Sequence, residues 1–231
     1  MPWSFGQRAR APCRPRGIGF RRTGVDMAEK SFPHQSAKGR LTVPEPLLIL
    51  GIPGSLRRHS YNRGLLEVAR EVATDGMTVE IAELTDVPLY NADIEAEGYP
   101  PGVMAFRARI AAAHALLIAT PEYNYSVPGV LKNAIDWASR PPESPLRHKP
   151  IALMGASAGV MGTVRAQLSL RQSFLNTESY VLLKPEIYVA NARDRFDPTG
   201  RLTDVSVRER IIMLLGALRD WIHRDPLGLD R

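Results

Sequence analysis

Five short apolar segments alternate with helical patterns between residues 47 and 223, and this alternation restricts the possible folds more than any other feature. Strands are predicted where uninterrupted or alternating apolar residues occur, at 47–52, 77–84, 115–119, 151–155 and 181–189. Pro185 interrupts the last of them, which favours the edge of a sheet. Apolar residues at helical spacing predict helices near 61–74, 103–113, 128–139, 163–176 and 204–223, and three prolines predict irregular structure within 85–101. The alternation predicts a parallel sheet covered by helices on both sides.

The positive charge of the chain is confined to its first 46 residues. The whole sequence has 30 Lys and Arg against 24 Asp and Glu, and residues 1–46 hold nine of the basic and three of the acidic residues. The remainder carries 21 of each sign and is neutral. We therefore predict a disordered basic N-terminal extension over 1–46 and one domain over 47–231. An alternative interpretation is that translation begins at Met27.

Residues 54–62, between the first predicted strand and the first predicted helix, are rich in hydrogen-bond donors and contain no carboxylate. A helix N-terminus adds backbone N–H groups and a favourable dipole for an anion. The motifs of nucleotide triphosphate loops and of dinucleotide folds are both missing, which favours a single phosphate group. The side-chain donors are Ser55, Arg57, Ser60 and Asn62. The competing interpretation is that Ser60 or Asn62 only caps the helix.

Residues 120–129, Thr-Pro-Glu-Tyr-Asn-Tyr-Ser-Val-Pro-Gly, connect the third strand to its helix. Two prolines stiffen this loop, and its tyrosines, asparagine and backbone N–H groups are suited to hold a flat heteroaromatic ring, unless the tyrosines only pack for stability. A third loop, 154–162, is composed mainly of small residues, which let a ligand approach the backbone closely. Ligands bind at the carboxyl ends of the strands in open α/β sheets, so the three loops are expected to meet there.

Several sequence patterns are absent, and their absence limits the kinds of reaction that this chain can catalyse with its own side chains. The only cysteine, Cys13, lies in the extension, which excludes a thiolate metal cluster and a core cysteine nucleophile. The five histidines show no metal-ligand spacing, no Gly-x-Ser-x-Gly motif occurs, and no apolar run approaches the ~20 residues that span a bilayer. A pocket without a nucleophile, a metal or a catalytic dyad indicates that the reactive centre is a bound cofactor.

The three loops together resemble the NAD(P)H-dependent FMN reductase family, and most closely its bacterial quinone and chromate reductases. The resemblance covers about residues 47–223 and is carried by Gly54-Ser55-Leu56-Arg57-x-x-Ser60-x-Asn62 and by 121–129 continuing through 131–137. It implies a flavodoxin-like three-layer fold with strand order 2-1-3-4-5. It also implies that Ser55, Arg57, Ser60, Tyr61 and Asn62 hold the FMN phosphate, that Pro121, Glu122, Tyr123 and Asn124 line the isoalloxazine edge, and that Ser157 closes the far side.

The resemblance further implies a ping-pong reaction. Hydride would pass from NADPH or NADH to flavin N5, and the electrons would then reach a quinone, an azo compound, a metal oxyanion or free flavin. No catalytic side chain and no metal is required. Arg140 is a candidate for the phosphates of the nicotinamide nucleotide, and the alternative interpretation is an arginine that lies at a helix C-terminus without a ligand.

The expected partners are small-molecule acceptors and further copies of the chain, as a homodimer or homotetramer in the cytoplasm, with no nucleic acid and no membrane. Leu168 stands where relatives often have an aromatic residue, which leaves the role of its helix in subunit contacts open. Two alternatives remain. One is a non-enzymatic electron carrier of the flavodoxin type, and the other is a nucleic-acid-associated protein that uses the basic extension.

Overall fold

The computed structural model describes residues 46–73 and 76–224. The predicted extension lies outside these residues except for Pro46, and so do Cys13 and Met27. The helices are α1 (Tyr61–Val72), α2 (Ala92–Glu97), α3 (Pro101–Ala112), α4 (Gly129–Ala138), α5 (Val164–Asn176) and α6 (Val205–Ile222), with a 3-10 turn at Ala192–Asp194. The strands are β1 (Leu47–Pro53), β2 (Met77–Ile81), β3 (Ala115–Ala119), β4 (Pro150–Ala156), β5 (Tyr180–Val181) and β6 (Ile187–Val189).

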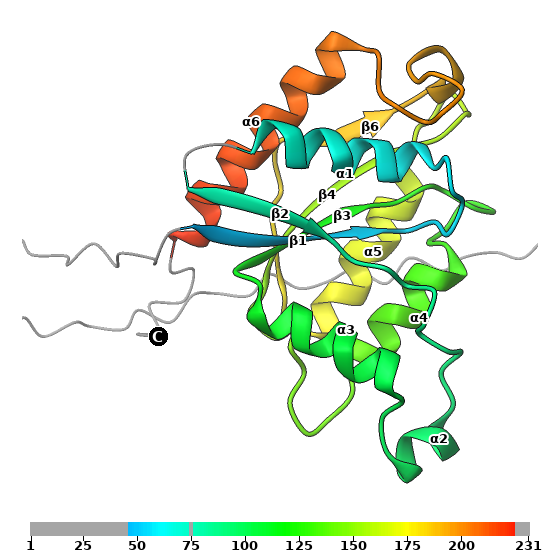
Figure 1. The fold of residues 1–231 in the computed structure, drawn as a ribbon, viewed down its shortest axis with the longest axis vertical. Helices are drawn as coiled ribbons and strands as arrows, with labels where there is room; N and C mark the ends of the chain where they lie inside the picture. The colour runs from blue at the N-terminus through cyan, green and yellow to red at the C-terminus, as the bar shows by residue number, and fades with distance from the viewer. Residues whose placement is uncertain (1–45, 74–75, 225–231) are drawn as a thin grey trace, which may run out of the picture. The chain divides into compact units, whose positions relative to one another are not determined.

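All strands of the sheet are parallel, and their order is β2-β1-β3-β4-β5 (Figure 1). The predicted fifth strand is present as two pieces: β5 pairs with the start of β4, and β6 pairs with its end. The chain leaves the sheet between them around Pro185, which has no N–H to contribute to a ladder. The predicted α/β fold and strand order are confirmed.

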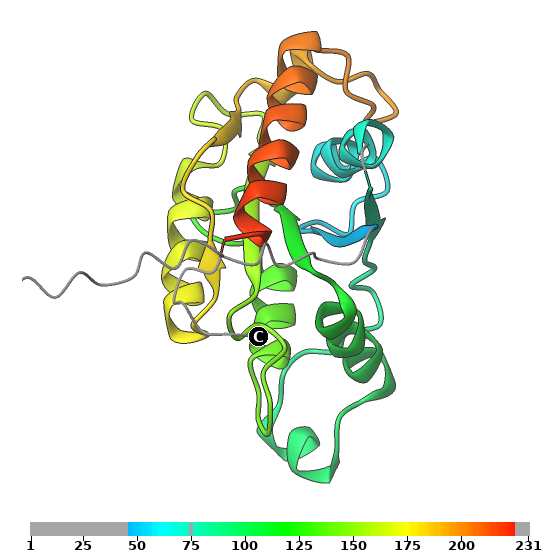
Figure 2. The ribbon, with the colours of Figure 1, turned by 90° about the vertical axis from the view of Figure 1, so that its left-hand side faces the viewer.

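Helices cover both faces of the sheet (Figures 1 and 2). One apolar core joins α1 and α6 to one face, and a second core joins α3, α4 and α5 to the other. Successive residues of β3 alternate between them: Leu117 belongs to the first core, whereas Leu116 and Ile118 belong to the second. A strand that is buried on both faces needs apolar residues at every position, which explains its uninterrupted apolar run.

The segment 85–101, predicted to be irregular, contains the short helix α2 and is attached to α4. Asn133 accepts a hydrogen bond from the N–H of Tyr90 (2.7 Å) and donates to the carbonyl of Pro88 (2.8 Å). The indole N–H of Trp137 donates to the same carbonyl (2.8 Å). Two residues of the 131–137 motif therefore hold the chain that follows β2.

Crossing a membrane requires a longer and more apolar helix than any that residues 46–73 and 76–224 contain.

Candidate functional site

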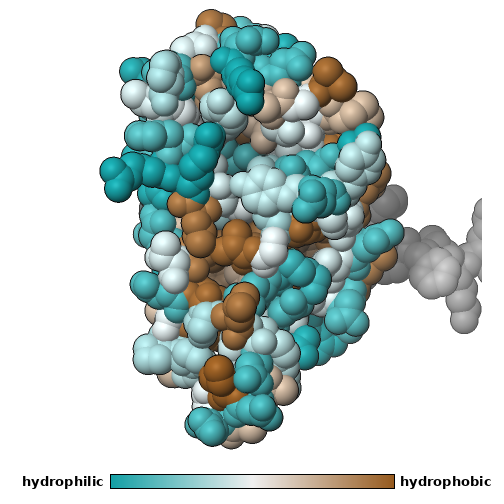
Figure 3. Space-filling view, turned by 90° about the vertical axis from the view of Figure 1, so that its right-hand side faces the viewer, coloured by the Kyte–Doolittle hydropathy of each residue, from teal (hydrophilic) through white to brown (hydrophobic). Residues whose placement is uncertain are grey.

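The three predicted loops leave the sheet at its carboxyl edge, side by side. In the sheet register Pro53 at the end of β1 is level with Ala119 of β3, and Ala119 is level with Met154 of β4. The order β1-β3-β4 thus brings the loops that begin at residues 54, 120 and 157 together. Figure 3 faces this edge, where hydrophobic residues lie in the middle of the face with hydrophilic residues around them.

The first loop presents unpaired donors at the N-terminus of α1. Ser60 is the N-cap residue, but its side chain makes no capping hydrogen bond, although only 3% of its surface is exposed. Among the described residues its hydroxyl has no partner. The first turn of α1 contains no acidic residue. The Arg57 guanidinium is exposed and lies 4.6 Å from the centre of the Tyr61 ring. The N-terminus of α1 is therefore open to an anion.

Asn62 connects the first loop to the third. Its amide donates to the carbonyl of Ala156 (2.9 Å) and accepts from the N–H of the same residue (2.8 Å), and only 2% of the residue is exposed. The side chain thus extends the hydrogen bonding of β4 and fixes α1 against its carboxyl end. The predicted contact between Asn62 and a phosphate stays a prediction, because the described partner of this amide is protein backbone.

The second loop is a tight turn with both tyrosines at its tip. Tyr123 and Ser126 exchange backbone hydrogen bonds of 3.2 and 2.9 Å, and the central residues Asn124 and Tyr125 have φ angles of 48° and 66°. These angles match a two-residue hairpin turn in which both central residues are left-handed. Tyr123 and Tyr125 are 51% and 71% exposed. The Tyr123 hydroxyl lies 3.5 Å from the hydroxyl of Ser55, so the first two loops are in contact.

Glu122 anchors the second loop to the helix that follows the third. Its carboxylate accepts hydrogen bonds from the backbone N–H groups of Arg165 (2.9 Å) and Ala166 (3.1 Å) and from the Arg165 guanidinium (2.8 Å). The N-cap residue of α5, Thr163, makes no capping bond of its own. The Arg165 guanidinium also lies over the Tyr125 ring, 3.8 Å from its centre. Glu122 thus supplies the missing cap and stiffens the turn.

The third loop contains glycines with different roles. A Cβ on Gly155 would stand 2.3 Å from the Thr120 carbonyl, so this glycine permits close packing of two chain segments rather than the approach of a ligand. A Cβ on Gly159 would meet no atom closer than 3.7 Å. The N–H of Ser157 donates to the carbonyl of Val189 (3.0 Å), and its hydroxyl accepts from the N–H of Gly159 (3.2 Å). Ser157 is therefore held at the rim of the site by β6.

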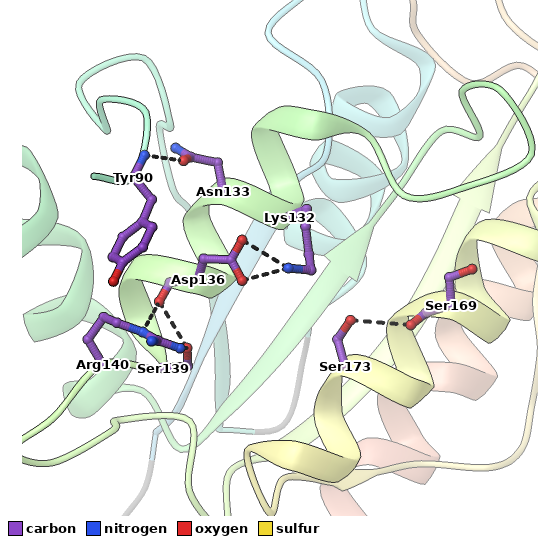
Figure 4. A network of polar contacts seen from close by, with 8 residues as sticks. All are labelled: Tyr90, Lys132, Asn133, Asp136, Ser139, Arg140, Ser169 and Ser173. Atoms are coloured by element: carbon purple, nitrogen blue, oxygen red, sulfur yellow. Dashed lines mark hydrogen bonds and ion pairs between the residues drawn. The ribbon is translucent and has the colours of Figure 1, made fainter. Parts of the chain in front are cut away.

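Arg140 is not brought to the three loops. It follows the C-terminus of α4, and a helix of ten residues is about 15 Å long. Its guanidinium donates to the Asp136 carbonyl (3.0 Å) and the Ser139 hydroxyl (2.9 Å), as Figure 4 shows, and lies 5.5 Å from the centre of the Tyr90 ring. This placement is that of an arginine at a helix C-terminus, and the predicted contact of Arg140 with the nicotinamide nucleotide stays a prediction.

A turn at residues 197–200, after β6, packs against the first loop and against α1. The Thr199 carbonyl lies 3.0 Å from Nδ1 of His59, and a Cβ on Gly64 would stand 2.1 Å from the Gly200 carbonyl. The turn is fixed by Asp197, whose pKa is lowered by hydrogen bonds from the Thr199 hydroxyl and from backbone N–H groups.

Possible metal ligands do not gather at this edge. Nowhere in the part of the chain that the structure describes do three or more His, Cys, Asp or Glu side chains lie close enough to hold a metal ion.

Comparison with known proteins identifies relatives of this chain. Residues 47–194 match the model of a family described as NADPH-dependent FMN reductase. A NAD(P)H-dependent FMN reductase from Pseudomonas aeruginosa is 52% identical over 180 residues, which cover 78% of this chain and 97% of that protein. A quinone reductase from Escherichia coli K12 is 39% identical over 183 residues, with 78% and 97% covered.

A solved structure agrees with these matches. The flavoenzyme NAD(P)H:acceptor oxidoreductase FerB from Paracoccus denitrificans superposes with a TM-score of 0.69 at 34% identity, and the match covers 76% of this chain and 97% of that one.

Proposed function

This chain belongs to the NADPH-dependent FMN reductase family, and we propose that it takes hydride from NAD(P)H and reduces quinones by a ping-pong mechanism. Relatives named as quinone reductases support the acceptor class. Azo compounds, metal oxyanions and free flavin are further acceptors that we propose on chemical grounds, since a flat and accessible redox ring discriminates poorly among oxidants. Use of NAD(P)H is consistent with a cytoplasmic location.

The observation that carries the proposal is the open N-terminus of α1. FMN has a single phosphate, and here an uncapped helix start, the partnerless hydroxyl of Ser60 and the Arg57 guanidinium lie together without an acidic residue in the first turn. The donors fit a phosphate dianion. Ser55 and Tyr61 lie next to these donors. The Ser55 hydroxyl contacts the Tyr123 hydroxyl, and the Tyr61 ring lies beneath the Arg57 guanidinium.

The remaining residues would position the ring system. FMN, when bound, supplies the hydride transfer and the delivery of electrons to the acceptor. The backbone of Pro121–Asn124, held by Glu122 and the 123–126 turn, would line one edge of the ring, and Ser157 would border the other side. Glu122 is occupied by three hydrogen bonds and is not available as an acid or base in this arrangement. The chain contributes a rigid and oriented pocket.

The competing hypothesis is an electron carrier that binds FMN and serves a protein partner. Carriers of the flavodoxin type tend to be strongly acidic on their docking face, whereas residues 47–231 carry equal numbers of basic and acidic side chains. Stopped-flow mixing with NADPH and with NADH distinguishes the two hypotheses. A reductase reduces its flavin rapidly without another protein, and a carrier does not.

The site itself is tested by FMN titration of the apoprotein. Arg57→Ala should weaken FMN binding by about 1.5–3 kcal/mol, the range of a hydrogen bond to a charged group. Arg70→Ala is the matched control, because Arg70 lies on α1 and pairs with Glu67 outside the site. Unchanged affinity in Arg57→Ala would place the phosphate elsewhere, and a protein that cannot be reconstituted with FMN would refute the proposed function.

We also propose that the protein forms a homodimer or homotetramer through α5. Two exposed leucines lie one heptad apart on this helix, Leu168 at 53% and Leu175 at 79% exposure. Residues seven positions apart lie on the same side of a helix. Because Glu122 and Arg165 join α5 to the second loop, a second copy on this helix would lie close to the site.

A further inference from the structure

A cavity borders the first loop on the side of β2. Its volume is about 200 Å³, and it lies between residues 53–58, the first turn of α1 and the chain after β2. It is lined by Pro53, Ser55, Leu56, Arg57, Arg58, Arg63, Glu83, Leu84 and Thr85. The loops proposed to hold the flavin ring follow β3 and β4, which lie on the other side of β1 in the strand order. The cavity and the proposed ring site are therefore on opposite sides of the first loop.

The lining of this cavity is positively charged. It contains three arginines and one glutamate, a net charge of two positive units. Arg63 is paired with Glu83 at 2.7 Å and is positioned by that contact. Arg58 is exposed and forms no ion pair with any residue that the structure describes. The hydroxyls of Ser55 and Thr85 add neutral donors, so the cavity is suited to an anion.

The size and charge of the cavity favour a phosphate group rather than a whole ligand. Pockets that enclose a small molecule have volumes of about 300–1,000 Å³. At about 200 Å³ this cavity accommodates one group of a larger molecule. A phosphate monoester carries about 1.5 to 2 negative charges at neutral pH, opposite in sign to the net charge of the lining.

The position of the cavity indicates which molecule carries that group. Three strand spacings separate β4 from β2, a distance of roughly 14 Å. A dinucleotide whose nicotinamide lies over the loops that follow β3 and β4 can extend along the carboxyl edge of the sheet, so that its adenosine end is directed towards the cavity. The phosphate at that end is the 2′-phosphate of NADPH, which NADH lacks.

We propose that this cavity binds the 2′-phosphate of NADPH and that Arg58 gives the protein its preference for NADPH over NADH. The inference rests on the proposed function, since it assigns one end of the co-substrate of the same site. Arg57 belongs to the FMN phosphate in that proposal, and Arg63 is engaged with Glu83. Arg58 is therefore the cation that remains for the co-substrate.

The test compares Arg58→Ala with wild type and with Arg70→Ala, which removes a positive charge near the start of the domain but outside the cavity. Steady-state oxidation of each nicotinamide with a quinone acceptor gives the KM values. Arg58→Ala should raise KM for NADPH about tenfold. This is near the lower limit of the effect expected for loss of a charge-assisted hydrogen bond, and we expect the lower limit because Arg58 is exposed. KM for NADH and the affinity for FMN should change less than about twofold, and Arg70→Ala should match wild type.

A binding measurement makes the test independent of turnover. Calorimetric titration with adenosine 2′,5′-bisphosphate and with adenosine 5′-monophosphate should show tighter binding of the bisphosphate to wild type and loss of this difference in Arg58→Ala. Equal changes for NADPH and NADH, no change for either, or weakened FMN binding would each overturn the assignment. Wild type that oxidises neither nicotinamide would refute the proposed function, while the titration would still decide whether the cavity selects a 2′-phosphate.

Discussion

Replacement of Glu122 tests whether the second loop is held by α5. In Glu122→Ala the backbone N–H groups of Arg165 and Ala166 lose their acceptor, and the Arg165 guanidinium loses its carboxylate. Loss of an N-cap costs about 0.5–2 kcal/mol. Breaking a buried ion pair costs about 3–5 kcal/mol and breaking an exposed one about 0–1. The Glu122 side chain is 9% exposed and that of Arg165 is 32% exposed, so this pair is intermediate between the two cases. We therefore expect Glu122→Ala to lower the free energy of unfolding by about 2–4 kcal/mol.

Urea unfolding of the apoprotein measures this loss. Glu122→Gln keeps one acceptor oxygen for the helix but not the charge, so about half of the effect should remain. Glu71→Ala is the control, because the Glu71–Arg208 pair is 48% and 44% exposed and its loss should cost less than about 1 kcal/mol.

Two outcomes would contradict the reasoning about Glu122. Glu122→Ala within about 0.5 kcal/mol of the control would refute its role as the cap of α5. If Glu122→Gln kept full stability but lost FMN affinity, the carboxylate would contact the cofactor directly, as the family resemblance implies.

Three further predictions concern residues that support the site, the N-cap of α6 and the proposed subunit contact. Asn62→Ala should lower the free energy of unfolding by about 2–4 kcal/mol in urea, because the N–H and carbonyl of Ala156 lose their partner in a buried position; a loss below about 1 kcal/mol would show that water replaces the amide. Asp204 caps α6, and its pKa is lowered to about 2, first by a hydrogen bond from Ser206. The ionised Asp204 therefore stabilises the folded state fully above about pH 4, and this contribution is lost as the pH falls towards 2. The free energy of unfolding should be about 1–2 kcal/mol lower in Asp204→Ala than in wild type above pH 4, and this difference should disappear between pH 4 and 2. A difference that is constant with pH would contradict the assignment. Leu168→Glu should lower the molar mass measured by light scattering, and an unchanged mass would exclude α5 as the contact.

The fold was predictable because its strands are buried on both faces. Runs such as 115–119 are apolar at every position, and prolines and glycines mark where the strands end. Element boundaries agree with the structure to within about three residues. Helix α2 was missed, since it buries none of its residues and has no apolar stripe. Arg140 lies away from the three loops because α4 begins at the carboxyl edge and carries its last residues about 15 Å from it, and its predicted contact with the nicotinamide nucleotide stays a prediction.

The partners of the site residues were not predictable from local sequence. Asn62 bonds a residue 94 positions away, and Glu122 bonds residues 43 and 44 positions away. Propensity and periodicity describe neighbours within a few residues, so they identify these side chains as polar and positioned near a helix start but not what they contact. The family resemblance implies that both side chains contact the cofactor, which stays a prediction, and their described contacts are with the protein.

These contacts explain why the motifs are so dense in polar residues. Hydrogen bonds connect the three loops and the helices that follow them. Ser55 contacts Tyr123, Asn62 accepts from the N–H of Ala156, and Glu122 accepts from the N–H of Arg165 at the start of α5. A site that holds a flat ring needs this mutual support, because a loop displaced by about an ångström no longer holds its ligand in the productive geometry. Motif residues that build the pocket and motif residues that contact the cofactor therefore occur side by side in the sequence. We predict that their replacement lowers different quantities: the stability of the apoprotein for Asn62 and Glu122, and the affinity for FMN alone for Arg57.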